Sequence, residues 1–66
     1  MPLVQVTVRE GTPAEHVRAL ISALTDAVVQ SVYVKKESVR VIVTEVQLAH
    51  WAAGDVTLEE RERVQE

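Results

Sequence analysis

Pro2 is the residue of this 66-residue sequence with the clearest chemical potential, because it directly follows Met1. Removal of Met1 would leave Pro2 with a free secondary amine, which is a base carried on a rigid ring. While Met1 stays attached, the nitrogen of Pro2 belongs to an amide and cannot accept a proton. A structural role is the alternative, since proline lacks an N–H but is tolerated at the first position of a strand. The sequence thus predicts either a catalytic base or a strand-start residue at position 2.

Two arginines and the single tryptophan are the other residues that could contact a substrate. Arg40 lies within a Val-rich segment and Arg9 at the end of another, where each could bind an anionic group or remain a solvated surface charge. Trp51 could line a pocket or anchor a core or subunit interface. His16 and His50 are predicted to have no catalytic role. Because the sequence has no cysteine, these two distant histidines are also too few for a zinc site.

Two strands are predicted from alternating side chains that are rich in β-branched residues. The first covers residues 3–8 and the second covers residues 39–46. In the first strand an apolar face of Val4, Val6 and Val8 alternates with Leu3, Gln5 and Thr7. In the second strand Val39, Val41 and Val43 alternate with Arg40, Ile42 and Thr44. Each strand is therefore expected to turn a valine face toward the core.

A helix-start signal lies between the two strands. Thr12 is a suitable N-cap, Pro13 fits the first helical position, and Glu15 would complete a capping box. Apolar residues then recur at helical spacing, at Val17, Leu20, Ile21, Leu24, Ala27 and Val28. We expect one amphipathic helix of about five turns that ends near Val32. Residues 33–38 are predicted to form the polar return loop.

The order of strand, helix and strand predicts a βαβ unit, in which the strands are parallel and the crossover is right-handed. After this unit, Gly54 and Asp55 predict a turn, and the Thr-Leu-Glu-Glu of residues 57–60 predicts a second capping box. Residues 61–66 are expected to be a frayed, charged end. The fold class is therefore predicted as α+β, in one domain with a short C-terminal hairpin or turn.

Oligomerisation is predicted from the size of the chain. A domain this short buries only about 60% of the surface that its unfolded form exposes, so a monomer would be marginal. The sequence has no cysteine for disulfides, while 47% of its residues are hydrophobic. Two strands and one helix also leave a sheet edge and part of a face uncovered. Subunit contacts are expected to serve as part of the core.

The charge balance restricts the class of partner. Ten acidic and seven basic side chains give a net charge of −3, which argues against nucleic acid or an anionic membrane as a partner. No apolar run approaches the roughly 20 residues that span a bilayer, and the start Met-Pro-Leu-Val lacks a signal-peptide pattern. We therefore expect a cytoplasmic protein.

Four features follow one another in a recognisable order: the start Met-Pro-Leu-Val-Gln-Val-Thr-Val, the Glu10-Gly11 corner, the Val-Arg-Val-Ile-Val-Thr-Glu block, and Trp51 with Gly54. In this order and spacing they resemble the 4-oxalocrotonate tautomerase family, from Pro2 to about Val56. The resemblance implies a single tautomerase-like domain over residues 1–66. It also implies dimers with four-stranded sheets, assembled as a hexamer that is a trimer of dimers, made of one chain or of two related chains.

The resemblance further implies an isomerase of aromatic-compound catabolism that needs no cofactor or metal. Its substrate would be a small 2-hydroxydienoate or 2-oxo acid, and Pro2, exposed by removal of Met1, would be the general base. Arg40 matches a family arginine, contributed by a neighbouring subunit, that polarises the 2-oxo or carboxylate end. Trp51 matches an aromatic residue that lines the apolar pocket.

One position departs from the family pattern. Thr12 stands right after the Glu10-Gly11 corner, where the family's tautomerase has an arginine that holds the far carboxylate of a dicarboxylate. Arg9 matches a substrate-binding arginine of some dehalogenating relatives and could compensate. Residues 52–55 also differ from the family's glycine-rich stretch. Two alternatives stay open: a hydratase- or dehalogenase-type relative acting on a short unsaturated acid, or a non-catalytic partner subunit of a mixed hexamer.

Overall fold

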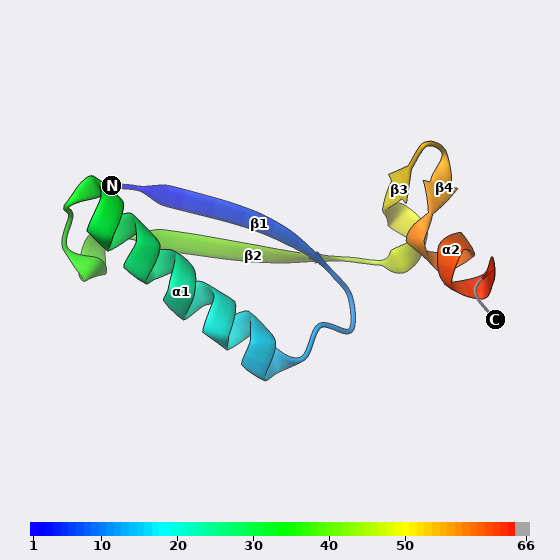
Figure 1. The fold of residues 1–66 in the computed structure, drawn as a ribbon, viewed down its shortest axis with the longest axis horizontal. Helices are drawn as coiled ribbons and strands as arrows, with labels where there is room; N and C mark the ends of the chain where they lie inside the picture. The colour runs from blue at the N-terminus through cyan, green and yellow to red at the C-terminus, as the bar shows by residue number, and fades with distance from the viewer. Residues whose placement is uncertain (65–66) are drawn as a thin grey trace.

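The computed structural model describes residues 1–64 and contains a βαβ unit followed by a C-terminal arm (Figure 1). The βαβ unit consists of β1 (Leu3–Arg9), α1 (Ala14–Val32), the 3-10 turn η1 (Lys36–Ser38) and β2 (Arg40–Val46). The arm consists of the 3-10 turn η2 (Leu48–His50), β3 (Ala52–Ala53), β4 (Val56–Thr57) and α2 (Leu58–Val64). The predicted order of elements is therefore confirmed.

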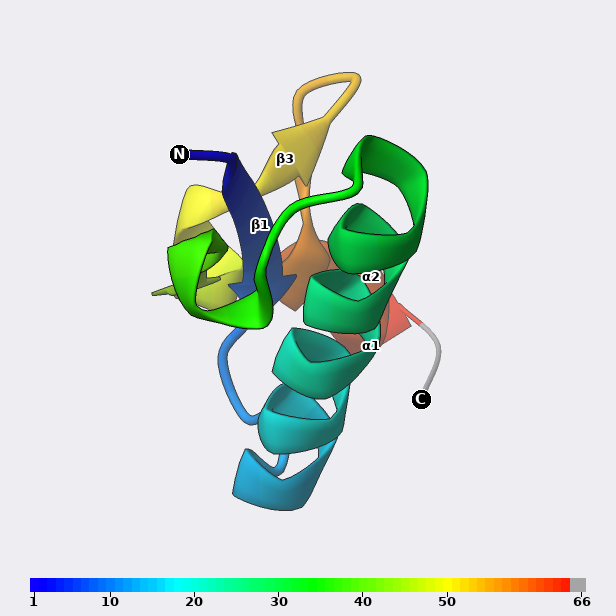
Figure 2. The same ribbon diagram turned by 90° about the vertical axis from the view of Figure 1, so that its left-hand side faces the viewer.

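Strands β1 and β2 are parallel, as the sequence predicts, with Leu3 opposite Arg40 and Arg9 opposite Val46. The predicted alternation is confirmed, because Val4, Val6 and Val8 are partly buried while their neighbours along β1 are exposed. Helix α1 packs against β2 and lies along one side of the sheet (Figure 2). Its partly buried residues include the predicted Val17, Leu20, Ile21, Leu24 and Val28.

The opposite face of the sheet is uncovered, with Leu3 55% and Ile42 47% exposed. None of residues 1–63 is fully buried. The chain exposes 5136 Å², whereas a compact monomer of its mass would expose about 4,200 Å². The excess of about 900 Å² is close to the area that one partner buries in a standard protein interface. The chain therefore lacks a closed core of its own.

The arm projects beyond the end of β2, away from the C-terminal end of α1 (Figure 1). As a result the radius of gyration is 15.3 Å, compared with about 11 Å for a compact domain of this length. A two-residue turn joins β3 to β4, and its Gly54 and Asp55 have φ of 60° and 65°. Positive φ at both central residues is typical of the type I′ turn that hairpins prefer. The predicted Gly-Asp turn is confirmed.

The second predicted capping box is also confirmed. The N–H of Thr57 donates to a carboxylate oxygen of Glu60 at 2.8 Å, and the N–H of Glu60 donates to the hydroxyl of Thr57 at 3.1 Å. Hydrogen bonds from Thr57 hold the pKa of the Glu60 carboxyl below its usual value, and the bond from the backbone N–H has a larger effect than the bond from the hydroxyl. This box fixes the start of α2, which continues through residues 61–64. The expected frayed end is therefore wrong for those residues, and residues 65–66 lie outside the described part.

The first predicted capping box is wrong. Helix α1 begins at Ala14 with Pro13 as its N-cap, and no side chain caps it. The hydroxyl of Thr12 instead donates to the carbonyl oxygen of Arg9 at 2.8 Å, within the turn that follows β1. Because the helix begins one residue later than predicted, Glu15 cannot reach back as the box requires. The second strand likewise begins at Arg40 rather than at Val39, which closes η1.

Candidate functional site

Pro2 and Arg40, the two predicted catalytic residues, are neighbours in the backbone. The N–H of Arg40 donates to the carbonyl oxygen of Pro2 at 3.0 Å. This contact follows from the parallel pairing, since the starts of two parallel strands lie at the same end of the sheet. Pro2 is partly buried, whereas Met1 is 88% exposed. The Met1–Pro2 bond therefore lies on the surface of the chain.

The side chain of Arg40 lies on the uncovered face of the sheet, because it shares that face with Leu3. Its guanidinium donates to the carbonyl oxygen of Glu37 at 3.0 Å. Within residues 1–64 no carboxylate forms an ion pair with it. A guanidinium has five N–H donors in a planar fork, so Arg40 is suited to bind a carboxylate or a 2-oxo group.

Arg9 and Trp51 lie toward the other end of the molecule. Arg9 is six positions along β1 from Leu3, which corresponds to about 20 Å at 3.3 Å per residue. Trp51 lies beyond the end of β2, where its carbonyl oxygen accepts the N–H of Leu58 at 2.8 Å and its side chain is partly buried. One chain thus brings Pro2 and Arg40 together but leaves the two predicted substrate-binding residues far from them.

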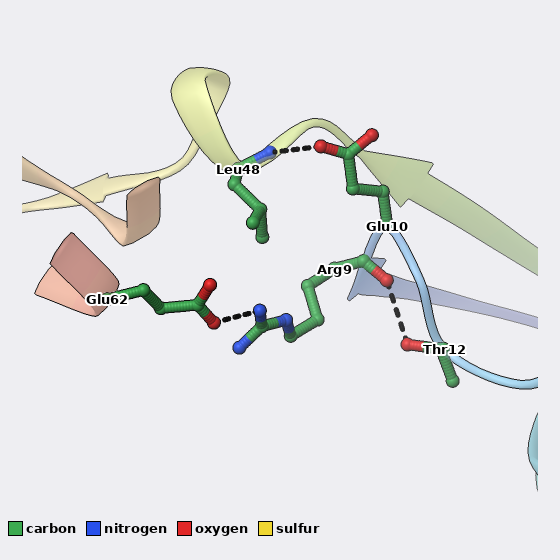
Figure 3. Close-up of polar contacts among 5 residues, drawn as sticks. All are labelled: Arg9, Glu10, Thr12, Leu48 and Glu62. Atoms are coloured by element: carbon green, nitrogen blue, oxygen red, sulfur yellow. Dashed lines mark hydrogen bonds and ion pairs between the residues drawn. The ribbon is translucent and has the colours of Figure 1, made fainter. Parts of the chain in front are cut away.

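A cluster of polar contacts surrounds Arg9 (Figure 3). The guanidinium of Arg9 pairs with the carboxylate of Glu62 in α2, and both side chains are about half exposed. Next to them, a carboxylate oxygen of Glu10 accepts the N–H of Leu48 at 3.1 Å. We call the residues of these contacts, together with Thr12, the Arg9 corner. The corner ties the end of β1 to the arm.

Glu62 is the residue of this cluster that sequence reasoning missed. It lies in the segment that was expected to be a frayed end, and 53 positions separate it from Arg9. No motif connects the two residues. The capping box at residues 57–60 is the one sequence signal that could have indicated an ordered carboxylate there. It predicts the start of a helix, and Glu62 lies in the first turns of that helix.

Other candidate chemistry is sparse in the described part of the chain. His16 and His50 are both exposed, in α1 and η2 respectively. In residues 1–64 no three histidine or acidic side chains gather closely enough to hold a metal ion. None of the helices described over that range combines the length and the apolar character needed to cross a membrane.

Comparison with known proteins gives a consistent result. A family model described as "Tautomerase enzyme" matches residues 2–61. A probable tautomerase of Ralstonia nicotianae is 50% identical to the chain over 56 residues, which is 85% of this chain and 80% of the relative.

Two solved structures are similar in both fold and sequence. TomN, described as a 4-oxalocrotonate tautomerase homologue of the tomaymycin biosynthetic pathway, has a TM-score of 0.93 at 37% identity and covers 98% of this chain and 100% of its own. A chain of a heterohexameric 4-oxalocrotonate tautomerase from Chloroflexus aurantiacus has a TM-score of 0.87 at 33% identity, with 91% of this chain and 97% of its own covered. The βαβ unit with its C-terminal arm is therefore shared with these proteins.

Proposed function

The chain belongs to the tautomerase family of isomerases, and we propose that it interconverts the enol and keto forms of a 2-hydroxydienoate or 2-oxo acid with Pro2 as the base. The observation that supports this proposal most directly is the hydrogen bond from the Arg40 N–H to the Pro2 carbonyl oxygen. It holds a potential base and a potential anion-binding group at one end of the sheet. The base becomes available when Met1 is removed.

The proposed reaction moves one proton. The secondary amine of Pro2 takes the proton of the 2-hydroxyl group, and the electron pair left on that oxygen forms the C=O bond. The carbon–carbon double bond shifts, and the protonated amine then gives its proton to a carbon of the former enol. A positioned base of this kind contributes roughly 10²–10⁴ to the rate. Partial burial of Pro2 disfavours the protonated amine, and the guanidinium of Arg40 would do the same once both groups hold one substrate, so both would keep Pro2 ready to accept a proton.

Arg40 would stabilise the negative charge that develops on the 2-oxygen during this transfer. Hydrogen-bond donors that are fixed before the reaction are effective in this role because they need no reorganisation. The bond from the Arg40 guanidinium to the Glu37 carbonyl oxygen supplies such a fixed orientation. The remaining N–H groups can then bind the 2-oxygen or the adjacent carboxylate.

We further propose that the complete site forms between copies of the chain. Pro2 and Arg40 lie about 20 Å along the sheet from Arg9, so one chain cannot bring all of them to a single small acid. The uncovered sheet face and the projecting arm both supply surface for such contacts. A trimer of dimers, each dimer with a four-stranded sheet, would cover this surface and bring the Trp51 end of one subunit near Pro2 of another.

Sedimentation of the purified chain is expected to show a hexamer. Six chains of 7.3 kDa give a mass of about 44 kDa. The physical reason is that none of residues 1–63 is fully buried, so the apolar residues must find cover in other subunits. A stable, well-folded monomer at micromolar concentration would contradict this prediction and remove the basis for a shared site.

We also propose that the preferred substrate is a monoacid, because Thr12 supplies no guanidinium for a second carboxylate. Thr12→Arg is expected to shift the ratio of kcat/KM for 2-hydroxymuconate over phenylenolpyruvate by at least about tenfold toward the diacid, since a charge-assisted hydrogen bond contributes roughly 1.5–3 kcal/mol. The variant loses the bond from the Thr12 hydroxyl to the Arg9 carbonyl oxygen, at a cost to the free energy of unfolding of about 1 kcal/mol. Ultraviolet absorbance follows both reactions. A parent enzyme that already turns over both acids equally well would show that Thr12 does not limit the diacid.

A second candidate function is a partner subunit in a mixed hexamer. Two observations favour it: Thr12 replaces a binding arginine, and one of the similar structures is described as a heterohexamer. Two measurements separate the candidates. The mass of the intact chain reports whether Met1 has been removed, and an assay of the chain by itself reports whether it needs another subunit.

A further inference from the structure

The pairing of Arg9 with Glu62 has a consequence for the substrate that the enzyme accepts. Arg9 ends β1, and Glu62 reaches it from the helix at the far end of the chain (Figure 3). The carboxylate of Glu62 thus forms the same kind of ion pair with the Arg9 guanidinium that the carboxylate of a substrate would form. Thr12 adds no cation, and Glu10 adds a second negative charge to the same corner.

The neighbouring cations of α2 contact partners outside the Arg9 corner. Arg61 donates to the carbonyl oxygen of Ala53 at 3.3 Å. Arg63 lies 3.7 Å from the carboxylate of Glu59, four residues before it on the same helix. Within the described residues 1–64, Arg9 is the one cation of the Arg9 corner, and Glu62 already pairs with it. A second substrate carboxylate therefore finds no free cation in this corner.

Glu62 is carried by a helix whose start is fixed. Thr57 and Glu60 form the capping box, and the N–H of Leu58 donates to the carbonyl oxygen of Trp51 at 2.8 Å. The segment that supplies Trp51 therefore also supplies Glu62, and the side chain of Glu62 can leave Arg9 without moving the helix. Both partners are exposed, 47% for Arg9 and 45% for Glu62, so water is available to solvate a displaced carboxylate.

We propose that Glu62 is a specificity-determining residue, which holds Arg9 and so favours acids whose far end is uncharged over dicarboxylates. This inference rests on the proposed function, in which a site formed between copies of the chain brings Arg9 to the same small acid as Pro2 and Arg40. A dicarboxylate must displace Glu62 before it can bind Arg9, whereas a monoacid with a neutral far end leaves the ion pair intact.

The decisive experiment compares Glu62→Gln with the parent enzyme on 2-hydroxymuconate and phenylenolpyruvate. We expect the ratio of kcat/KM for the diacid over the monoacid to rise about two- to fivefold, the size that displacement of an exposed ion pair allows. The rise should come from a lower KM for the diacid. Glu59→Gln is the matched control, because it removes the same charge from the same helix but frees Arg63 rather than Arg9, and its ratio should equal that of the parent.

Three results would overturn the proposal. These are an unchanged ratio in Glu62→Gln, an equal rise in Glu59→Gln, and a rise that persists in the double variant Arg9→Gln/Glu62→Gln. The equal rise would indicate an effect of net charge alone. The persistent rise would show that Arg9 does not bind the freed carboxylate.

A binding measurement keeps this inference separate from the proposed reaction. Adipate and hexanoate cannot tautomerise in this way, so calorimetric titration with them measures the binding of a diacid and of a monoacid without any turnover. Glu62→Gln should bind adipate about two- to fivefold more tightly than the parent does, with no comparable gain for hexanoate. If the parent turned over neither acid, the proposed reaction would fail, while the adipate titration would still support or overturn the role of Glu62.

Discussion

Pro2→Ala is expected to lower kcat/KM for tautomerisation at least about tenfold. The upper limit of the loss is the factor of about 10²–10⁴ that a positioned base contributes to the rate. Alanine at position 2 also permits removal of Met1 and leaves a primary amine. A primary amine can still accept a proton, but it lacks the basicity of the secondary amine and the rigidity of the ring. The loss should therefore appear in kcat, which reports the chemical step.

Pro13→Ala is the matched control for this variant, because Pro13 is the other proline of the chain and lies at the start of α1. It should keep the activity of the parent. Intact mass must show that Met1 is absent from the parent and from Pro2→Ala, and sedimentation must show the same assembly for both. Full activity in Pro2→Ala, or in a parent that keeps Met1, would exclude Pro2 as the base.

Arg40→Ala is the second substitution with a large expected effect. Removal of one preorganised donor to a developing oxyanion typically costs about 10²–10³ in kcat. We expect a loss of this size, measured by the ultraviolet change of phenylenolpyruvate. The backbone N–H that donates to Pro2 remains in the variant, so the start of the sheet should keep its geometry.

Arg18→Ala provides the comparison for Arg40→Ala. Arg18 is also an exposed arginine, but it lies in the first half of α1 and forms no ion pair within the described residues. Its replacement should leave kcat and KM unchanged. Arg40→Lys should recover part of the loss, because it restores the charge without the planar fork. Equal activity in Arg40→Ala and the parent would rule out contact between Arg40 and the reacting oxygen.

The assembly determines how these variants must be interpreted. Each subunit has an uncovered sheet face and an arm that projects past its own βαβ unit. If the site forms between copies, a substitution in the arm of one subunit changes the site of another. Mixing impaired Pro2→Ala chains with impaired Arg40→Ala chains tests this arrangement. If Pro2 and Arg40 act from one subunit, as proposed above, no activity returns, whereas restored activity would show that they act from different subunits.

Much of the fold was predictable because the signals are local. Alternating side chains determine the faces of β1 and β2, and helical spacing of apolar residues determines α1. The turn at Gly54 and Asp55 and the capping box of Thr57 and Glu60 depend on residues at most three positions apart. The interactions that stabilise these elements lie within the segment itself, which is why the sequence predicts them. The equally local signal at Thr12 gave a wrong prediction, because Pro13 is the N-cap of α1 and the Thr12 hydroxyl bonds to the Arg9 carbonyl oxygen.

The sequence likewise indicated Pro2 and Arg40, and it led to the family through the order of its motifs. The tertiary structure was needed for the contacts that cross the chain. It pairs Arg9 with Glu62, and through the register of β1 and β2 it places Arg40 beside Leu3 and so about 20 Å along the sheet from Arg9. These outcomes depend on how the strands register and where the arm projects. Both are set by packing between distant segments, so no local pattern of residues predicts them.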